Sequence, residues 1–160
     1  MNRRRLLREI ALRSLYAYFS DPDDAGLVLA NVTRRDLAAH PELASEKADV
    51  RFVEDLILKC VRLQDECDAL IGARTANWEV ERTALIDRII LRMGITEFLE
   101  FEDIPTRVTI NECIELAKNF STAKSGKFVN GVLDAILIDL KSAGRIVKKG
   151  RGLIDTPSKS

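Results

Sequence analysis

The sequences TRVTINECIELAKNF, residues 106–120, and SGKFVNGVLDAIL, residues 125–137, decide how the chain is interpreted. Both place apolar residues at helical spacing, and the second is expected to pack one face into a core. Lys127, Phe128 and an Asn-Gly pair nevertheless stand near the expected start of that second helix. A cation, a flat ring and a glycine that permits close approach suit a nucleic-acid strand better than core packing alone.

Helical periodicity continues through almost all of the 160 residues, glycine and proline are scarce, and strand-like alternation is missing from the sequence. The length suits about one domain, or two very small subdomains that share a core. Thr109 and Glu112 match a capping box, and Ser125 is the expected N-cap of the last helix. The spacing predicts an all-α fold with helices over residues 3–19, 24–40, 48–73, 80–101, 110–119 and 125–142.

A change of composition marks the end of the predicted helical domain, which covers residues 1–142. Gly144 is a suitable stop for the last helix. Residues 143–160 are rich in Lys, Gly, Ser and Pro, so we expect them to form a basic, disordered tail.

The charge of the chain is zero overall but is unevenly distributed. The first 18 residues hold five arginines against one acid, and residues 141–160 hold six cations against Asp155. Residues 79–103, in contrast, hold seven acids against three arginines. Basic ends and an acidic middle predict two surfaces that bind two different partners.

Three cysteines without disulfide-type spacing indicate a reducing compartment. The basic N-terminus is interrupted by arginines and does not match a signal peptide, and no apolar run reaches the ~20 residues that span a bilayer. These features predict a cytoplasmic protein without a membrane contact.

His40, the only histidine, stands before a proline, and the sequence has no zinc spacing, phosphate-binding glycine loop or nucleophile motif. We therefore expect no catalysis, no metal and no cofactor.

The first expected helix carries a basic arc. At about 100° per residue, Arg4, Arg5 and Arg8 fall within roughly 100°, and Tyr16 lies near the edge of that arc. Guanidinium groups beside a ring suit phosphate contacts and base stacking. A solvated basic face is the alternative.

In the last expected helix, Phe128 lies about 100° from the centre of the apolar stripe and Lys127 nearly opposite that stripe. The helix dipole at the first turn would favour an anion there. Gly131 weakens the helix by about 0.5–1 kcal/mol and requires a reason, either close packing or close approach of a ligand. Peripheral packing of Phe128 is the alternative to RNA stacking.

Three motifs resemble those of the NusB family of bacterial transcription antitermination factors, and they occur in the same order as in that family. A shorter match in the acidic segment supports them, and together the matches extend from about residue 4 to residue 140. The matching residues are Arg4-Arg5-x-x-Arg8-Glu9 with Ala11-Leu12-x-x-Leu15-Tyr16, Ile89-x-Leu91-Arg92, Ile104-Pro105-x-x-Val108-x-Ile110-Asn111-Glu112 with Ile114-Glu115-Leu116-Ala117-Lys118, and Lys127-Phe128-Val129-Asn130-Gly131-Val132-Leu133-Asp134.

The resemblance implies an all-α, NusB-like fold of two small helical subdomains with about six to seven helices. It implies a factor that binds boxA-type single-stranded RNA together with NusE, a small-subunit ribosomal protein, and that acts on the RNA polymerase elongation complex, notably in ribosomal RNA operons. By position, it implies that Asp87 and Arg88 face NusE. It places the RNA contacts on Arg4, Arg5, Arg8, Tyr16, Lys127 and Phe128.

The chain also departs from the family pattern. Lys124 stands where the family often has an acidic residue, and this lysine adds positive charge at the expected RNA edge. Residues 20–48 look variable, and the basic tail is longer than the fold requires. An RNA-binding ribosome-assembly factor and a pure protein-interaction module are the alternative functions, and both a monomer and a homodimer are open.

Overall fold

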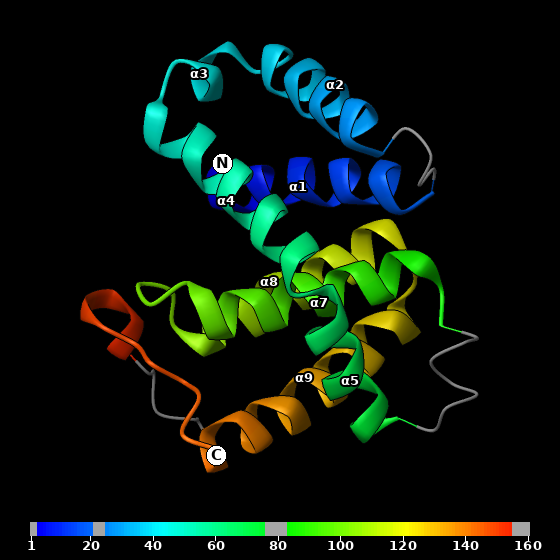
Figure 1. Ribbon diagram of the computed structural model, residues 1–160, viewed down its shortest axis with the longest axis vertical. Coiled ribbons are helices and arrows are strands. Elements are labelled where there is room, and N and C mark those ends of the chain that lie inside the picture. The colour runs from blue at the N-terminus through cyan, green and yellow to red at the C-terminus, as the bar shows by residue number, and fades with distance from the viewer. Residues whose placement is uncertain (1–2, 21–24, 76–82, 155–160) are drawn as a thin grey trace. The chain divides into compact units, whose positions relative to one another are not determined.

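The structure is a computed structural model that describes residues 3–20, 25–75 and 83–154 (Figure 1). These residues form eight α-helices and one short 3-10 helix, and no strand occurs among them. The prediction of an all-α fold is confirmed, and the helix count is close to the expected six to seven. The chain divides into two compact units, Met1–Arg62 and Leu63–Ser160.

The first unit contains four helices: α1 (Arg3–Ser20), α2 (Ala25–Ala38), α3 (Pro41–Ala44) and α4 (Lys47–Arg62). Helix α1 packs against both α2 and α4. The short helix α3 starts with Pro41, whose fixed backbone angle suits a first helical position. The buried apolar residues of α1 and α4 include Leu7, Ile10, Ala11, Leu15, Phe52, Val53, Leu56, Ile57 and Cys60.

The prediction of a single long helix over residues 48–73 is wrong, because two helices cover this range. The chain leaves helical geometry at Leu63 (φ −93°, ψ 9°), which separates α4 from α5 (Gln64–Arg74). Basic residues end α4 and acidic residues begin α5. That order of charges complements the dipoles of two separate helices. The charges in the sequence therefore indicate this boundary, although neither glycine nor proline marks it.

The second unit is built around α7 (Leu85–Glu100), which contacts α5, α8 (Thr106–Phe120) and α9 (Ala123–Ser142). Every residue from 89 to 98 is buried. A Cβ atom added at Gly94 would lie 3.0 Å from Leu133 and 3.1 Å from the Sγ atom of Cys113. Gly94 therefore allows α8 and α9 to pack closely on α7.

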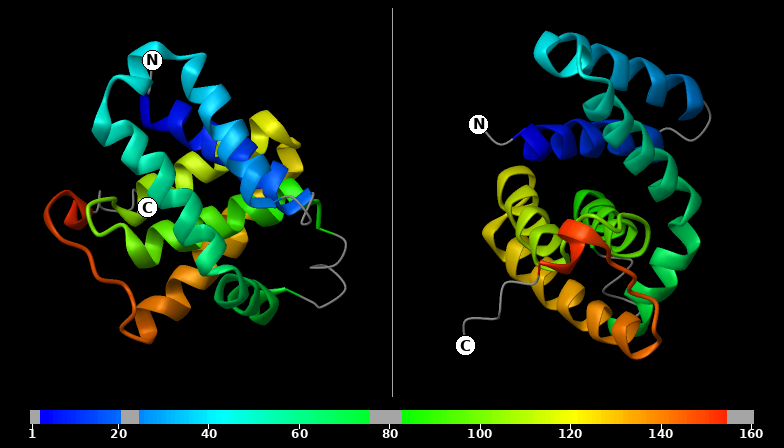
Figure 2. Two further views of the ribbon diagram at one scale, coloured as in Figure 1. Left: turned by 45° about the horizontal axis from the view of Figure 1, so that its top comes forward. Right: turned by 90° about the vertical axis from the view of Figure 1, so that its left-hand side faces the viewer.

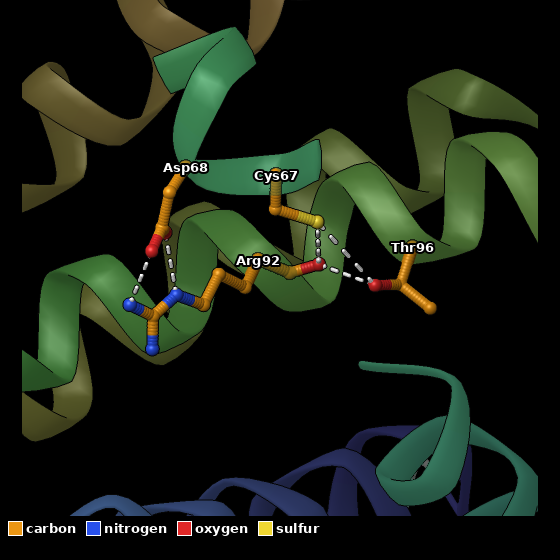
Figure 3. Close-up of polar contacts among 4 residues, drawn as sticks. All are labelled: Cys67, Asp68, Arg92 and Thr96. Atoms are coloured by element: carbon orange, nitrogen blue, oxygen red, sulfur yellow. Dashed lines mark hydrogen bonds and ion pairs between the residues drawn. The ribbon is translucent and has the colours of Figure 1, made fainter. Parts of the chain in front are cut away.

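Arg92, the last residue of the Ile89-x-Leu91-Arg92 match, joins α5 to α7 (Figure 3). Its Nε and Nη2 atoms donate to the two carboxylate oxygens of Asp68 at 2.8 and 3.0 Å. Its carbonyl oxygen accepts from Thr96 at 2.7 Å and from the thiol of Cys67 at 3.8 Å. Arg92 is buried, so its role in this fold is structural.

Both predicted helix caps in the second unit are wrong. Helix α8 begins at Thr106, and the hydroxyl of Thr109 donates to Glu97 Oε1 at 2.8 Å instead of capping a helix. Helix α9 begins at Ala123, and Thr122 caps it by accepting from the backbone N–H of Ser125 at 3.0 Å. Lys127 and Phe128 consequently lie in the second turn of α9, beyond the first turn in which the helix dipole favours an anion.

Gly144 ends α9 as predicted. Its φ of 69° is left-handed, its N–H donates to Lys141 O at 3.0 Å, and the N–H of Arg145 donates to Leu140 O at 2.9 Å. This pair of bonds is the Schellman arrangement that satisfies the last carbonyls of a helix.

The structure describes residues 143–154 of the segment that follows α9, and this part contacts the end of α7. The Nζ atom of Lys148 donates to the carbonyls of Glu97 and Phe101 at 3.0 and 2.7 Å and so covers the end of α7. Burial lowers the pKa of Lys148, against the opposing effect of nearby carboxylates. The 3-10 helix η2 (Gly150–Leu153) lies beside the connection between α7 and α8 (Figure 2). A Cβ atom at Gly152 would overlap the carbonyl oxygen of Glu102, so only glycine fits there.

Candidate nucleic-acid interface

Two arginines of the predicted basic arc on α1 contact the ring of Phe52, a residue of α4. The guanidinium carbon of Arg4 lies 4.1 Å from the ring centroid, and that of Arg8 lies 5.6 Å from it. Both distances suit cation–π attraction. Arg4 is exposed and Arg5 is half-buried, whereas Arg8 is only 2% exposed. Arg4 and Arg5 can therefore reach a ligand, and Arg8 anchors α1 on α4.

Tyr16 is 44% exposed on α1. It follows Arg5 by eleven residues, which places both on one side of the helix about 16 Å apart along its axis. An exposed ring at that position suits stacking by a base.

The start of α9 presents two lysines. Lys124 is the second residue of the helix, and Lys127 is in the next turn; both are exposed. Neither ammonium group has an ion-pair partner within residues 3–20, 25–75 and 83–154. The first turn contains no acidic residue, although a carboxylate there would stabilise the helix. Charge at this end of α9 is thus arranged to attract an anion at some cost to the helix.

Phe128 is half-buried between the buried Val129 and the exposed Lys127. Phe128 therefore lies at the rim of the core, which agrees with its angle of about 100° from the apolar stripe. A ring that is anchored on one side and exposed on the other provides a surface for stacking next to two cations.

Asp87, predicted to face a protein partner, is 7% exposed in the first turn of α7. Its Oδ2 atom accepts from the hydroxyl of Ser125 at 2.8 Å. The hydroxyls of Ser121 and Thr122 lie 2.9 and 3.1 Å from that of Ser125. These contacts fix the start of α9 relative to the start of α7.

Arg88, the other predicted partner contact, is half-buried beside Asp87. Its Nε atom is buried and has no hydrogen-bond partner in the part of the chain that the structure describes. The guanidinium group therefore keeps a donor that the fold itself does not use.

The thiols offer neither a nucleophile nor a metal site. All three cysteines are buried, and burial raises the pKa of Cys67 to about 12. The described residues contain no group of three or more His, Cys, Asp or Glu side chains placed to hold a metal ion. None of the helices in the described ranges is both long and apolar enough to cross a membrane.

The sequence matches the NusB family over residues 5–137. The chain belongs to the NusB family. The transcription antitermination protein NusB of Salinibacter ruber is 43% identical over 154 residues, which cover 96% of this chain and 92% of that protein. The protein of the same name from Chloroherpeton thalassium is 38% identical over 98% of this chain and 71% of its own length.

Solved NusB structures share the fold. A solved structure of T. maritima NusB has a TM-score of 0.74 and 30% identity, and the match covers 87% of this chain and 92% of that one. A chain in the crystal structure of antitermination factors NusB and NusE in complex with dsRNA has a TM-score of 0.73 and 24% identity, over 87% and 98% of the two chains. The resemblance drawn from the motifs is confirmed.

The structure divides the predicted RNA residues between the two units. Arg4, Arg5, Arg8 and Tyr16 belong to the first unit, whereas Lys124, Lys127 and Phe128 belong to the second. Two contributors were missed. Phe52 has no sequence signal, because it looks like any core residue of α4. Thr122 did have one, because a threonine at the start of a helix is a common cap.

Proposed function

We propose that this chain is a transcription antitermination factor without enzymatic activity. In this role it binds boxA-type single-stranded RNA together with NusE and acts on the RNA polymerase elongation complex. Membership of the NusB family supports the proposal, as does the function in the name of relatives that match nearly the whole chain. The observation that carries it is the exposed pair Lys124 and Lys127 beside the half-buried ring of Phe128.

The chemistry of these residues fits a single strand. Lysines neutralise phosphates without reading sequence, and a ring stacks on any base. On the first unit, Arg4 and Arg5 supply further phosphate contacts and Tyr16 a second ring. Arg8, a member of the predicted set, contributes by holding Phe52 beneath Arg4, because its own guanidinium is buried.

The proposed protein partner is NusE, which accompanies a NusB chain in one of the solved structures. The start of α7 is the proposed contact, with the half-buried Arg88 as the residue that can reach the partner. The carboxylate of Asp87 lies inside the fold, so Asp87 acts indirectly. It accepts a hydrogen bond from Ser125 and thereby fixes the start of α9 relative to α7. Charge complementarity at such a contact mainly speeds association and fixes orientation.

The test combines purified protein, NusE and labelled RNA of boxA or scrambled sequence over a series of salt concentrations. We expect boxA RNA to bind more tightly than scrambled RNA, NusE to increase that affinity, and the variant Lys127→Glu to lose binding. Lys141→Glu is the matched control, because Lys141 is an exposed lysine in the last turn of the same helix.

The alternatives give different results. Binding of NusE without any RNA affinity would indicate a protein-interaction module. RNA binding that NusE leaves unchanged, with no association with polymerase in a reconstituted elongation complex, would favour a ribosome-assembly factor and contradict antitermination.

A further inference from the structure

Gly131 lies in the interior of α9 and is exposed. It has no left-handed φ that would require glycine, since only Gly144 and Gly150 do among the described glycines. Glycine in the interior of a helix destabilises the helix relative to alanine. Some other property of this position must therefore favour glycine.

Packing does not supply the reason. At Gly126, in the same helix, a Cβ atom would lie 3.1 Å from the Cγ atom of Lys118, so α8 restricts that site. At Gly131 a Cβ atom would meet nothing within 4 Å. The open alternative for Gly131, a close contact between helices, finds no support among the described residues of the second unit.

The surroundings of Gly131 match those of a strand of RNA. Lys127 precedes it by four residues, and Lys124 by seven, so all three share one side of α9. Asn130 is exposed beside it and can both donate and accept a hydrogen bond. Asp134 follows by three residues and is also exposed, so its carboxylate would repel a phosphate. The favourable surface for a polyanion thus ends at Gly131.

We propose that Gly131 is the point at which the ribose–phosphate backbone of the bound RNA crosses α9 in direct contact with the helix. Lys127 neutralises the adjacent phosphate, and the amide of Asn130 bonds a ribose hydroxyl or a base edge. The missing side chain lets the strand lie against the helix while a base stacks on Phe128. This inference rests on the proposed function of α9 as an RNA surface.

The variant Gly131→Ala tests the inference, because stability and binding should change in opposite directions. Alanine should raise the midpoint of urea unfolding, since it removes the cost of a helical glycine. The dissociation constant for boxA RNA should rise roughly fivefold or more, as a methyl group inserted into a close contact would cause. Gly131→Leu should weaken binding further.

Gly72→Ala is the matched control. Gly72 lies in α5, and a Cβ atom there also meets nothing within 4 Å. The Gly72→Ala variant should be more stable than the unmodified protein and should bind RNA with unchanged affinity. Lys127→Ala, in contrast, should reduce the slope of log affinity against log salt by about 0.7, whereas Gly131→Ala should leave the slope unchanged because it removes no charge.

The outcomes separate the two proposals. Unchanged RNA affinity in Gly131→Ala, with a clear loss in Lys127→Ala, would overturn the crossing point and leave the RNA function intact. A Gly131→Ala protein less stable than the unmodified chain would reveal a structural role for this glycine and also overturn it. Absence of RNA binding by the unmodified protein would contradict the proposed function itself.

Discussion

The hydroxyl of Ser125 in α9 donates a hydrogen bond of 2.8 Å to the buried carboxylate of Asp87 in α7. The two residues are 38 positions apart in the sequence, and each lies in the first turn of its helix. Lys124 precedes Ser125 directly, and Lys127 follows it by two residues. The position of the proposed RNA surface on α9 therefore depends on a contact inside the second unit.

Ser125→Ala should lower the free energy of unfolding by about 1–3 kcal/mol, because it leaves a buried acceptor without its donor. Faster amide exchange in the first two turns of α9 and weaker RNA binding should accompany this loss. Asp87→Asn should cost less than Asp87→Ala, since the amide oxygen can still accept from Ser125. Urea unfolding and hydrogen exchange measure these effects. Equal stability of Ser125→Ala and the unmodified chain would show that the contact contributes little.

Arg5 and Arg8 should respond differently to substitution. Arg5→Ala should reduce the salt slope of RNA binding by about 0.7, the effect of one lost phosphate contact on a single strand. Arg8→Ala should instead destabilise the first unit by about 2 kcal/mol or more, because a desolvated cation–π contact with Phe52 is lost. Salt titrations and thermal unfolding of both variants make the comparison. A normal salt slope in a folded Arg5→Ala protein would remove Arg5 from the interface.

Phe128→Ala should weaken RNA binding by about 1–3 kcal/mol if a base stacks on the ring. Replacing a fully buried phenylalanine by alanine lowers the free energy of unfolding by about 3–5 kcal/mol. Phe128→Ala should lower it by less, since Phe128 is half-buried. Affinity and unfolding must be measured on the same preparation. Large destabilisation with undiminished affinity of the folded fraction would identify Phe128 as a core residue only.

Lys124→Asp should have effects of opposite sign. At the second position of α9, an acidic residue interacts favourably with the helix dipole and should stabilise the protein by about 0.3–1 kcal/mol. RNA binding should weaken by about 1 kcal/mol at low salt and by less at high salt, because screening reduces the charge effect. Lys141→Asp makes the same charge change at the other end of α9 and serves as the control. If both variants bind RNA alike at every salt concentration, Lys124 is not part of the RNA surface.

Gly152→Ala should detach the segment that follows α9, because a Cβ atom there overlaps the carbonyl of Glu102. Loss of this contact should also disturb the bonds that Lys148 donates to the end of α7. We expect a lower melting temperature and faster trypsin cleavage at residues 148–151. Gly72→Ala, which meets no neighbouring atom, should show neither change. Unaltered cleavage in Gly152→Ala would mean that the segment accommodates the methyl group.

Local patterns in the sequence predicted most of the fold and the family, because helical spacing and short motifs depend on neighbouring residues. The caps were mispredicted because they depend on distant ones. Ser125 and Thr122 are both good capping residues, and the position of Asp87 decides which hydroxyl is used for another bond. Thr109 likewise bonds Glu97 on α7 rather than its own helix.

The candidate site shows the same limit. Helical geometry grouped Arg4 with Arg8, but only the ring of Phe52 distinguishes the exposed guanidinium from the buried one. The acidic character of residues 79–103 suggested an exposed role for Asp87, yet its partner Ser125 lies on α9. Packing between helices determines such assignments, and no pattern within one helix reports it.

The burial of Cys60, Cys67 and Cys113 makes the chain well suited to thiol-specific labelling. Buried thiols react slowly with maleimides, and the raised pKa of Cys67 leaves almost no thiolate at neutral pH. A single cysteine introduced at the exposed position of Asp134 would therefore carry a fluorophore selectively, next to the place where the RNA strand is proposed to cross α9. The emission of that fluorophore would follow the arrival and departure of RNA in real time, without removal of any native residue in the basic surface.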